Sequence, residues 1–318
     1  MKKRISIICG SVLGVLLIAL GFAGNYFYSV SVDRSHGSVE LHGGEEAEPV
    51  SATVDEEKLA EQEAIAWQEA QDFEILEHVS EDGLKLKAKF LKSEPSSGKA
   101  VILAHGYRGH SDQMPGITRF YHEQGFDVLK PDARGHGESE GDYVGYGWHD
   151  RKDYQKWIDL LINEKGATNI LLHGFSMGGA TVLMTSGEDL PDEVKGIIND
   201  SGYTSVREEL VHQLKHMYGL PSFPLMEVTS FITNLRAGYT FEEASAIEQV
   251  KKNTRPLLII HGDQDDLVPT EMAYRIEEVA KSDKELWIVP GAGHTKGYTV
   301  AKEEYEQRVL DFITKVLD

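Results

Sequence analysis

From residue 99 onwards, short apolar runs alternate with segments of helical periodicity, and this alternation restricts the fold more than any other feature of the chain. Runs such as Leu257–Ile260 show no polar alternation, which is typical of strands covered on both faces. The sequence therefore predicts an α/β fold with a mostly parallel central sheet flanked by helices. The expected strands lie near 99–104, 126–131, 168–173, 194–199, 256–261 and 285–289, and the expected helices lie near 112–124, 149–164, 177–187, 270–281 and 300–317.

Two segments interrupt this alternation. The alternating runs 73–79 and 84–91 flank the turn sequence SEDG at 80–83, so we expect a β-hairpin ahead of the parallel strands. Between about 203 and 250, helical patterns, two prolines and many large apolar residues crowd together after a predicted strand. Connections of that length are usually functional or independently structured. We expect a helical cap insertion there, with an extra pair of helices packed on the domain as the alternative.

The N-terminus has the composition of a membrane-directed segment. Three cations at 2–4 precede the charge-free run Ile5–Ala23, which is long enough as a helix to cross a bilayer. The positive-inside rule then predicts a single-pass membrane protein, with residues 1–30 as anchor, the N-terminus in the cytoplasm and the rest of the chain outside. The alternative is secretion after cleavage near Gly21-Phe22-Ala23, which resembles a signal-peptide processing site. The apolar run exceeds the usual length of a signal peptide core, which favours the anchor.

Composition and charge restrict the structure of the next segment and the kinds of partner and metal site that are possible. Residues 31–54 are poor in large apolar side chains, which predicts an acidic, flexible stalk before a folded domain at 55–318. A helix from about 55 to 72 is expected to open that domain, with Thr53 and Glu56 at capping-box spacing. The formal charge is -20, and thirteen acids against one base at 40–77 contribute -12 of it, which argues against a nucleic-acid partner. A single cysteine, Cys9, allows neither an intrachain disulfide nor a thiolate metal site.

The sequence HGFSMGG at 173–179 lies between an apolar run and a small-residue helical segment. A nucleophilic serine needs a sharp, exposed turn from strand to helix, and glycines let the backbone pass closely around it. The helix that follows adds a partial positive charge near the hydroxyl. The pattern GFSMG in this context predicts Ser176 as a nucleophile; a purely structural glycine turn is the alternative.

Two further residues follow the last two predicted strands. His294 lies in PGAGH after the run 285–289, and Asp265 lies in HGDQDDLVP after the run 256–261. A histidine at the carboxyl edge of the sheet can take the serine proton, and a carboxylate can fix its tautomer and stabilise the imidazolium. Asp200, at the end of another predicted strand, competes with Asp265 for this role. The chain order serine, acid, histidine is the order of the α/β-hydrolase arrangement.

The oxyanion of an acyl-transfer intermediate needs two hydrogen-bond donors. The backbone N–H of Met177, directly after the expected nucleophile, is one candidate. The loop HGYRG at 105–109 follows the expected strand at 99–104 and supplies the second. We expect the N–H of Tyr107 to be that donor.

Together these motifs resemble the α/β-hydrolase superfamily, in particular bacterial membrane-anchored or secreted serine hydrolases related to the serine aminopeptidase, monoglyceride lipase and cinnamoyl esterase groups. The resemblance covers about residues 73–318 and rests on HGYRG, GFSMGG, HGDQDDLVP and GAGH. It implies a nucleophile, acid, base and two oxyanion donors at Ser176, Asp265, His294, Tyr107 and Met177.

The same resemblance extends to DARGHGES at 132–139, which looks like the D-x-R-G-x-G-x-S loop of the family and is structural in such proteins. Arg108 and His110 stand where relatives often carry small or amide residues. They predict either a more polar pocket or two side chains that face water.

We expect an ester hydrolase that acts on a small-molecule acyl substrate outside the membrane, without a cofactor. A peptidase or amidase would use the same triad, and a noncatalytic ligand-binding protein of the same fold is a further alternative. Metal-dependent hydrolysis through His105, His173, His261 and the run Asp263, Asp265 and Asp266 lacks the usual ligand spacing.

Overall fold

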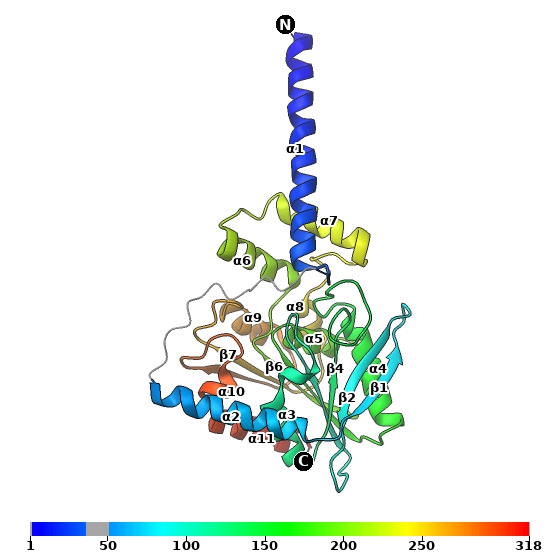
Figure 1. Ribbon diagram of the computed structural model, residues 1–318, viewed down its shortest axis with the longest axis vertical. Helices are drawn as coiled ribbons and strands as arrows, with labels where there is room; N and C mark the ends of the chain where they lie inside the picture. The colour runs from blue at the N-terminus through cyan, green and yellow to red at the C-terminus, as the bar shows by residue number, and fades with distance from the viewer. Residues whose placement is uncertain (1, 36–50, 318) are drawn as a thin grey trace.

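A central sheet of eight strands organises the protein, whose computed structural model describes residues 2–35 and 51–317. The strand order is β1-β2-β4-β3-β5-β6-β7-β8, in which β1 pairs antiparallel with β2 and β2 antiparallel with β4, while the other neighbours are parallel. The strands are β1 (Glu74–Val79), β2 (Lys85–Leu91), β3 (Lys99–Ala104), β4 (Asp127–Pro131), β5 (Asn169–Phe175), β6 (Val194–Asp200), β7 (Leu257–Gly262) and β8 (Lys284–Val289). The arrangement, drawn in Figure 1, confirms the predicted hairpin and the mostly parallel sheet of an α/β-hydrolase fold.

Helices cover both faces of the sheet, as the continuous apolar runs predict. Alternate residues of β3 belong to different cores: Ile102 packs in one and Val101 in the other. The first core contains side chains of α4 (Asp150–Asn163), α5 (Met177–Ser186), α8 (Ala246–Val250) and α9 (Glu271–Val279). The second core contains side chains of α3 (Pro115–Glu123) and α11 (Lys302–Leu317).

Two of the predicted helices are interrupted. The segment expected at 112–124 is a 3-10 turn, η1 (Ser111–Gln113), followed by α3, which begins at Pro115 because proline is well suited to the first helical position. The segment expected at 300–317 is divided into α10 (Gly297–Val300) and α11. Neither division changes the topology.

The insertion at 203–250 divides into two parts. The helices α6 (Val206–Tyr218) and α7 (Leu225–Ala237) lie over the carboxyl edge of the sheet and form the cap (Figure 1). The third helix, α8, packs on α5 and belongs to the helical layer of the domain instead. The insertion therefore forms a two-helix cap, and a single short helix, rather than the alternative pair, packs on the domain.

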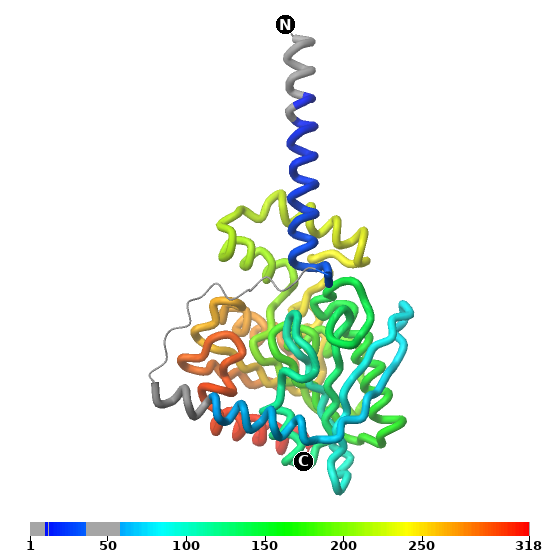
Figure 2. Tube along the Cα trace, viewed as in Figure 1, coloured from blue at the N-terminus to red at the C-terminus, as the bar shows by residue number. Residues whose placement is uncertain are grey.

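The C-terminal end of the N-terminal helix α1 (Lys2–Ser31) packs on the cap helix α7, and the described, exposed residues before that contact project from the cap (Figure 2). Its segment Leu13–Ser31 is long and apolar enough to cross a membrane. The chain after it is not a free stalk at its start, because Val32 is fully buried and Asp33 forms a β-bridge with Tyr143. Arg34 also donates to backbone carbonyls of the loop at 137–141.

The rest of the predicted stalk is described only in part. Residues 36–50 lie outside the described residues, and 51–54 belong to α2 (Ser51–Glu69). That helix begins four residues before the predicted start, so Thr53 lies inside it rather than at its N-cap. It packs against α3 through Ala64 and its neighbours because even this acidic segment carries a few apolar residues on one face.

Candidate active site

Ser176 stands at the turn between β5 and α5, with φ 54° and ψ -118°. A positive φ is strained for any residue with a Cβ, and such strain is concentrated at functional sites. Gly178 shows why this motif requires glycine, because a Cβ there would lie 2.1 Å from the carbonyl oxygen of Ala104. The glycines of this motif let the turn approach β3 and present the serine hydroxyl above the sheet edge.

The three residues predicted to act together form one hydrogen-bonded chain. His294 Nε2 lies 2.7 Å from Ser176 Oγ, and His294 Nδ1 lies 2.8 Å from Asp265 Oδ2. Asp265 follows β7 and His294 follows β8, so both reach the serine from neighbouring strands at the carboxyl edge of the sheet. The arrangement can pass a proton from the hydroxyl to an imidazole whose tautomer the carboxylate fixes.

Asp265 is held as an anion by its surroundings. Its Oδ1 accepts from the backbone N–H groups of Leu267 at 3.1 Å and Val268 at 2.8 Å, and His261 Nε2 lies 3.2 Å from Oδ2. Burial would raise the pKa of this carboxyl, but hydrogen bonds from His261 and His294 outweigh it and lower the pKa to about 2. The sequence analysis did not place His261 beside this carboxylate, although its position at the end of β7, four residues before Asp265, was the available signal.

Asp200, the competing acid, does not contact His294. Its buried carboxylate accepts from Tyr305 Oη and Ser201 Oγ, each at 2.8 Å, and burial raises its pKa. Its backbone carbonyl accepts from the N–H of Ser176 at 2.8 Å. Asp200 therefore supports the serine turn, and Asp265 is the carboxylate next to the histidine.

The loop at 105–109 runs beside the serine, since a Cβ on Gly106 would lie 3.6 Å from Ser176 Cβ. Two buried histidines hold this loop: His105 Nε2 accepts from Ala133 N–H at 3.0 Å, and His136 Nε2 accepts from Arg108 N–H at 3.1 Å. Burial lowers the pKa of each imidazole to about 4, so both are neutral acceptors near pH 7. The loop at 132–139 thus has the supporting position that the resemblance implied.

Tyr107 and Met177, the expected oxyanion donors, both line the pocket at the serine. Met177 is the first residue of α5, and the first N–H groups of a helix have no intrahelical partner. The N–H of Met177 is therefore free of an intrahelical partner beside Ser176, as an oxyanion donor must be, and Tyr107 borders the same pocket.

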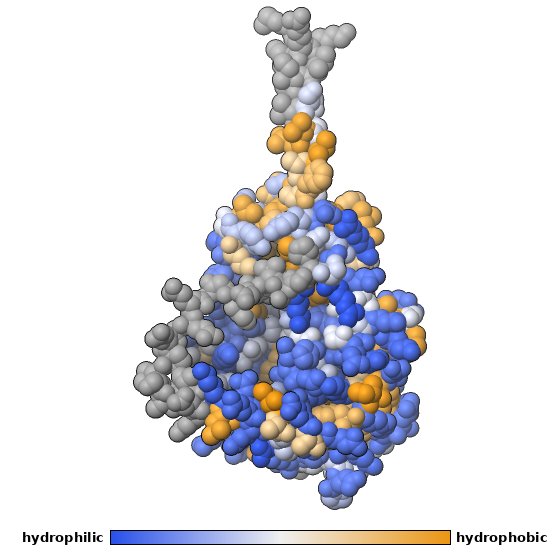
Figure 3. All heavy atoms as spheres, in the orientation of Figure 1, coloured by the Kyte–Doolittle hydropathy of each residue, from blue (hydrophilic) through white to orange (hydrophobic). Residues whose placement is uncertain are grey.

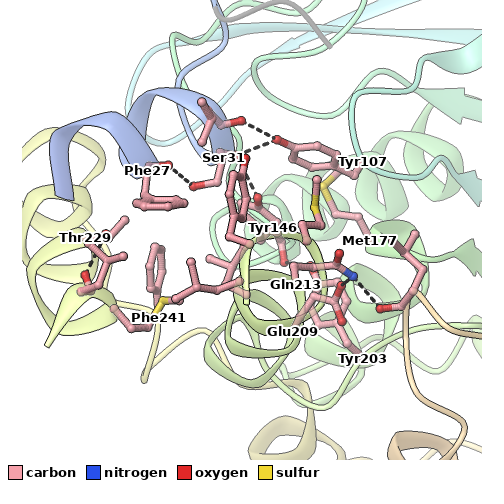
Figure 4. A pocket seen from close by; sticks show the side chains of 18 of the residues that line it. Phe27, Ser31, Tyr107, Tyr146, Met177, Tyr203, Glu209, Gln213, Thr229 and Phe241 are labelled. Carbon is pink, nitrogen blue, oxygen red and sulfur yellow. Dashed lines mark hydrogen bonds between the residues drawn. The ribbon is translucent and has the colours of Figure 1, made fainter. Parts of the chain in front are cut away.

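Ser176 opens onto a pocket between the sheet edge, the cap and the end of α1 (Figure 4). Leu214 and Met217 come from α6, and Met226 comes from α7. Phe27, Val30 and Ser31 come from α1, which the sequence assigned only to membrane attachment. Most of the lining is apolar, as binding sites for small acyl molecules commonly are.

Arg108 and His110 do not line this pocket. The guanidinium of Arg108 turns to the end of α1 and donates to the carbonyls of Val30 at 3.3 Å and Asp33 at 3.1 Å. His110 is exposed and accepts from the N–H of Asp112 at the start of η1. The prediction of a more polar pocket from these two residues is wrong, because Arg108 binds the end of α1 and His110 faces the surface.

Among the described residues, no three side chains of the ligand-forming types are grouped to hold a metal ion. His105 binds the loop at 132–139, His173 lies between the hydroxyls of Tyr121 and Tyr305, and His261 contacts Asp265. The three histidines of the metal alternative therefore serve three different places in the fold.

Comparison with known proteins agrees with this geometry. The profile of the prolyl oligopeptidase family matches residues 114–318, more than half of the chain. The chain belongs to the prolyl oligopeptidase family. YqkD of Bacillus subtilis is 30% identical over 219 residues, covering 69% of this chain and 72% of that protein. A monoacylglycerol lipase of Mycolicibacterium smegmatis is 25% identical over 249 residues, covering 67% of this chain and 86% of that protein.

Solved structures extend the comparison within this family's fold. The esterase Pf2001 of Pyrococcus furiosus superposes with a TM-score of 0.65 at 25% identity, over 79% of this chain and 95% of that chain. Est1E of Butyrivibrio proteoclasticus, solved with ferulic acid, has a TM-score of 0.59 at 22% identity, over 76% of this chain and 99% of that chain. The chain is a hydrolase of the α/β-hydrolase superfamily.

The pocket of this family member also contains a buried polar pair that the sequence did not single out. Gln213 Nε2 donates to Glu209 Oε1 at 3.0 Å and to the carbonyl of Leu267 at 2.6 Å (Figure 4). Burial raises the pKa of Glu209 to about 8, so this carboxyl group is largely neutral at pH 7. Its Oε2 and the Oε1 of Gln213 have no hydrogen-bond partner among residues 2–35 and 51–317. The i,i+4 spacing of the two residues in α6 was the signal available in the sequence.

Proposed function

We propose that the protein is a membrane-anchored serine hydrolase that cleaves a carboxylic ester through an acyl-enzyme intermediate. The observation that carries this proposal is the hydrogen-bonded chain from Ser176 Oγ through His294 to Asp265, at 2.7 and 2.8 Å. Ser176 lines an apolar pocket, and such a pocket suits the apolar acyl group of an ester.

In this proposal Ser176 Oγ attacks the ester carbonyl while His294 Nε2 takes its proton. The N–H groups of Met177 and Tyr107 stabilise the oxyanion of the tetrahedral intermediate. Collapse of that intermediate breaks the bond to the alcohol oxygen, and the imidazolium returns the proton to the leaving alcohol. Water, deprotonated by His294, then attacks the acyl-enzyme, and the departing serine oxygen recovers the proton.

An ester is favoured over an amide or peptide by the charge of the pocket. Glu209 is its buried carboxyl group, and a pKa of about 8 keeps this group largely neutral at pH 7, which suits an uncharged acyl chain. The esterase and lipase names among the similar proteins agree with this assignment.

A peptidase or amidase is the second candidate, favoured by the family to which the chain belongs. Glu209 is again the relevant residue, because its unpartnered Oε2 could pair with the ammonium group of an aminoacyl substrate. The same triad would then protonate an amine leaving group.

We also propose that α1 anchors the enzyme in the cell membrane, with its basic N-terminus in the cytoplasm and the hydrolase outside. The apolar segment Leu13–Ser31 and the cations at 2–4 support this orientation. Secretion after cleavage is the alternative. Intact mass of the mature protein isolated from membranes distinguishes the two.

The proposed function is tested by labelling the full chain with a fluorophosphonate, comparing Ser176→Ala with Ser97→Ala as a control for an exposed serine. We expect labelling to be lost only in the first variant. Rates on p-nitrophenyl butyrate and on an aminoacyl p-nitroanilide then compare ester with amide. Labelling that persists in Ser176→Ala would disprove the nucleophile, and a faster rate on the anilide would select the second candidate.

A further inference from the structure

The cap helix α7 exposes two large apolar side chains while it buries three hydroxyl groups. Phe231 and Leu235 are 61% and 69% exposed, beside the exposed polar residues Asn234 and Arg236. Thr229, Ser230 and Thr233 are buried together with Met226 and Ala237. A surface helix of a soluble protein usually presents polar residues outward, so the exposed Phe231 and Leu235 indicate that this part of α7 meets an apolar environment.

The buried hydroxyl groups of α7 are satisfied without water. Thr229 and Thr233 each donate to the carbonyl four residues earlier, at 2.9 Å, and Ser230 donates to Glu242 at 3.1 Å. The buried hydroxyl groups are therefore satisfied in the observed orientation of the helix.

The apolar surface continues into the loop before α7. We call Leu220, Phe223, Phe231 and Leu235 the cap patch; Phe223 is 74% exposed and Leu220 is 40% exposed. Figure 3 shows hydrophobic surface on the cap on both sides of α1. Several large apolar side chains exposed on one part of a protein mark an interaction site.

The position of α1 determines which partner reaches the cap patch. The helix packs on α7 at Gly24, where a Cβ would lie 2.5 Å from Val228 Cγ1, and Asn25 Oδ1 accepts from Arg236 at 2.8 Å. The charge-free run Ile5–Ala23 before this contact is about 28 Å long at about 1.5 Å per residue, close to the thickness of the hydrocarbon core. Gly24 and α7 therefore lie together at the edge of the hydrocarbon.

The pocket lies directly beneath this boundary. Phe27, Val30 and Ser31 of α1 line it, and the carbonyl of Ser31 accepts from Tyr107 Oη at 2.9 Å and Tyr146 Oη at 2.8 Å (Figure 4). The end of the anchor is thus fixed as one wall of the pocket that contains Ser176.

We propose that the cap docks on the outer surface of the same bilayer that α1 crosses, through the cap patch, and that the pocket receives the acyl chain of an ester from that bilayer. The docking half of the proposal follows from the exposed apolar side chains of the cap patch and from the contact of α7 with α1 at the edge of the hydrocarbon. The substrate half rests on the proposed function. An anchor that forms a wall of the pocket is retained in the working enzyme.

Docking is tested with the full chain, in a Cys9→Ser background, reconstituted in vesicles of phosphatidylcholine and phosphatidylglycerol. An environment-sensitive dye is attached at Phe231→Cys or Leu235→Cys, with Phe22→Cys on α1 as positive control and Val300→Cys, an exposed apolar position on α10, as negative control. We expect doxyl-labelled lipid to quench the cap dyes as it quenches the dye at 22. Cap dyes that behave like the dye at 300 would overturn the docking, as would blue-shifted emission without lipid quenching, which indicates a protein partner or a second copy.

The substrate half is tested by Phe231→Glu with Leu235→Glu, compared with Ile75→Glu with Val79→Glu on the exposed face of β1, which changes the charge equally. We expect the first pair to slow hydrolysis of p-nitrophenyl palmitate in the vesicles on the order of tenfold, with p-nitrophenyl acetate unaffected. Equal rates for the two double variants on the palmitate would refute delivery from the bilayer. Absence of hydrolysis of both esters by the unmodified chain would instead refute the proposed function, and the quenching result would stand independently.

Discussion

Replacing Glu209 by Gln should remove a pH dependence of stability that this single carboxyl group creates. The pKa of Glu209 is raised from 4.5 to about 8 by burial, so between these values the folded protein holds a proton that the unfolded chain releases. The bound proton therefore stabilises the folded protein fully below pH 4.5, and this stabilisation is lost as the pH rises towards 8. Because one pKa unit corresponds to about 1.4 kcal/mol, the loss over the whole window is on the order of 5 kcal/mol.

The variant keeps the shape of the site, since a glutamine oxygen can accept from Gln213 as the carboxyl oxygen does. We expect urea unfolding of the full chain in detergent, at pH 5, 7 and 9, to show the free-energy difference between wild type and Glu209→Gln changing in favour of the variant as the pH rises. Glu69→Gln, on the exposed surface of α2, is the matched control and should not change this profile. A constant difference between wild type and Glu209→Gln across pH 5 to 9 would show that the raised pKa is wrong.

The same proton should affect catalysis. Above pH 8 the pocket acquires a negative charge at Glu209, which opposes an apolar chain. We expect KM for p-nitrophenyl butyrate to rise above pH 8 in the wild type and to rise less in Glu209→Gln. Parallel KM profiles would remove Glu209 from the substrate-binding surface.

Other predictions follow from the triad and its supports. Asp265→Asn should lower kcat for p-nitrophenyl butyrate by about 10⁴-fold, because the imidazole loses the partner that fixes its tautomer. Asp200→Asn should lower the unfolding temperature and change kcat much less, since Asp200 binds Tyr305 and Ser201; a larger fall in kcat than in Asp265→Asn would reverse the assignment. Tyr107→Phe removes the hydrogen bond to the carbonyl of Ser31 and the one accepted from Arg108 Nε, each worth about 1 kcal/mol, and leaves its backbone N–H in place. We therefore expect a raised KM for long esters at nearly unchanged kcat for p-nitrophenyl acetate, and the two rates falling together would contradict this separation.

The sequence predicted most of the fold because the interactions that determine it are local. Apolar runs without alternation, such as Leu257–Ile260, can be stable only between two layers of helices, and the structure places them there. Helix ends were predicted less well. Pro115 and Ala301 divide segments that their periodicity presents as continuous, and α2 begins before the expected capping residue.

The meeting of Ser176, Asp265 and His294 could also be predicted from the chain, since parallel strands bring their carboxyl ends to one edge. The preference for Asp265 over Asp200 depended on the motif HGDQDDLVP, because both residues follow strands, and the packing is what turns Asp265 towards His294 and Asp200 towards Tyr305. The i,i+4 spacing of His261 with Asp265 and of Glu209 with Gln213 allows a contact within each pair, but only the folded structure places the first pair beside His294 and the second in the pocket.

The sequence by itself determined the order of the candidate site residues along the chain: a serine at a strand-to-helix turn, followed by two loop residues after later strands. Each position depends on a short segment, and the right-handed connections between parallel strands bring these segments to one edge of the sheet. Only the tertiary structure decided the use of the N-terminal helix. The sequence of an apolar segment predicts membrane attachment but does not show what the segment contacts. In the structure, Gly24 packs on α7 and the carbonyl of Ser31 accepts from Tyr107 and Tyr146, so the end of this helix forms a wall of the pocket. Such contacts join residues more than 70 positions apart, and their energy exists only when the whole chain has folded.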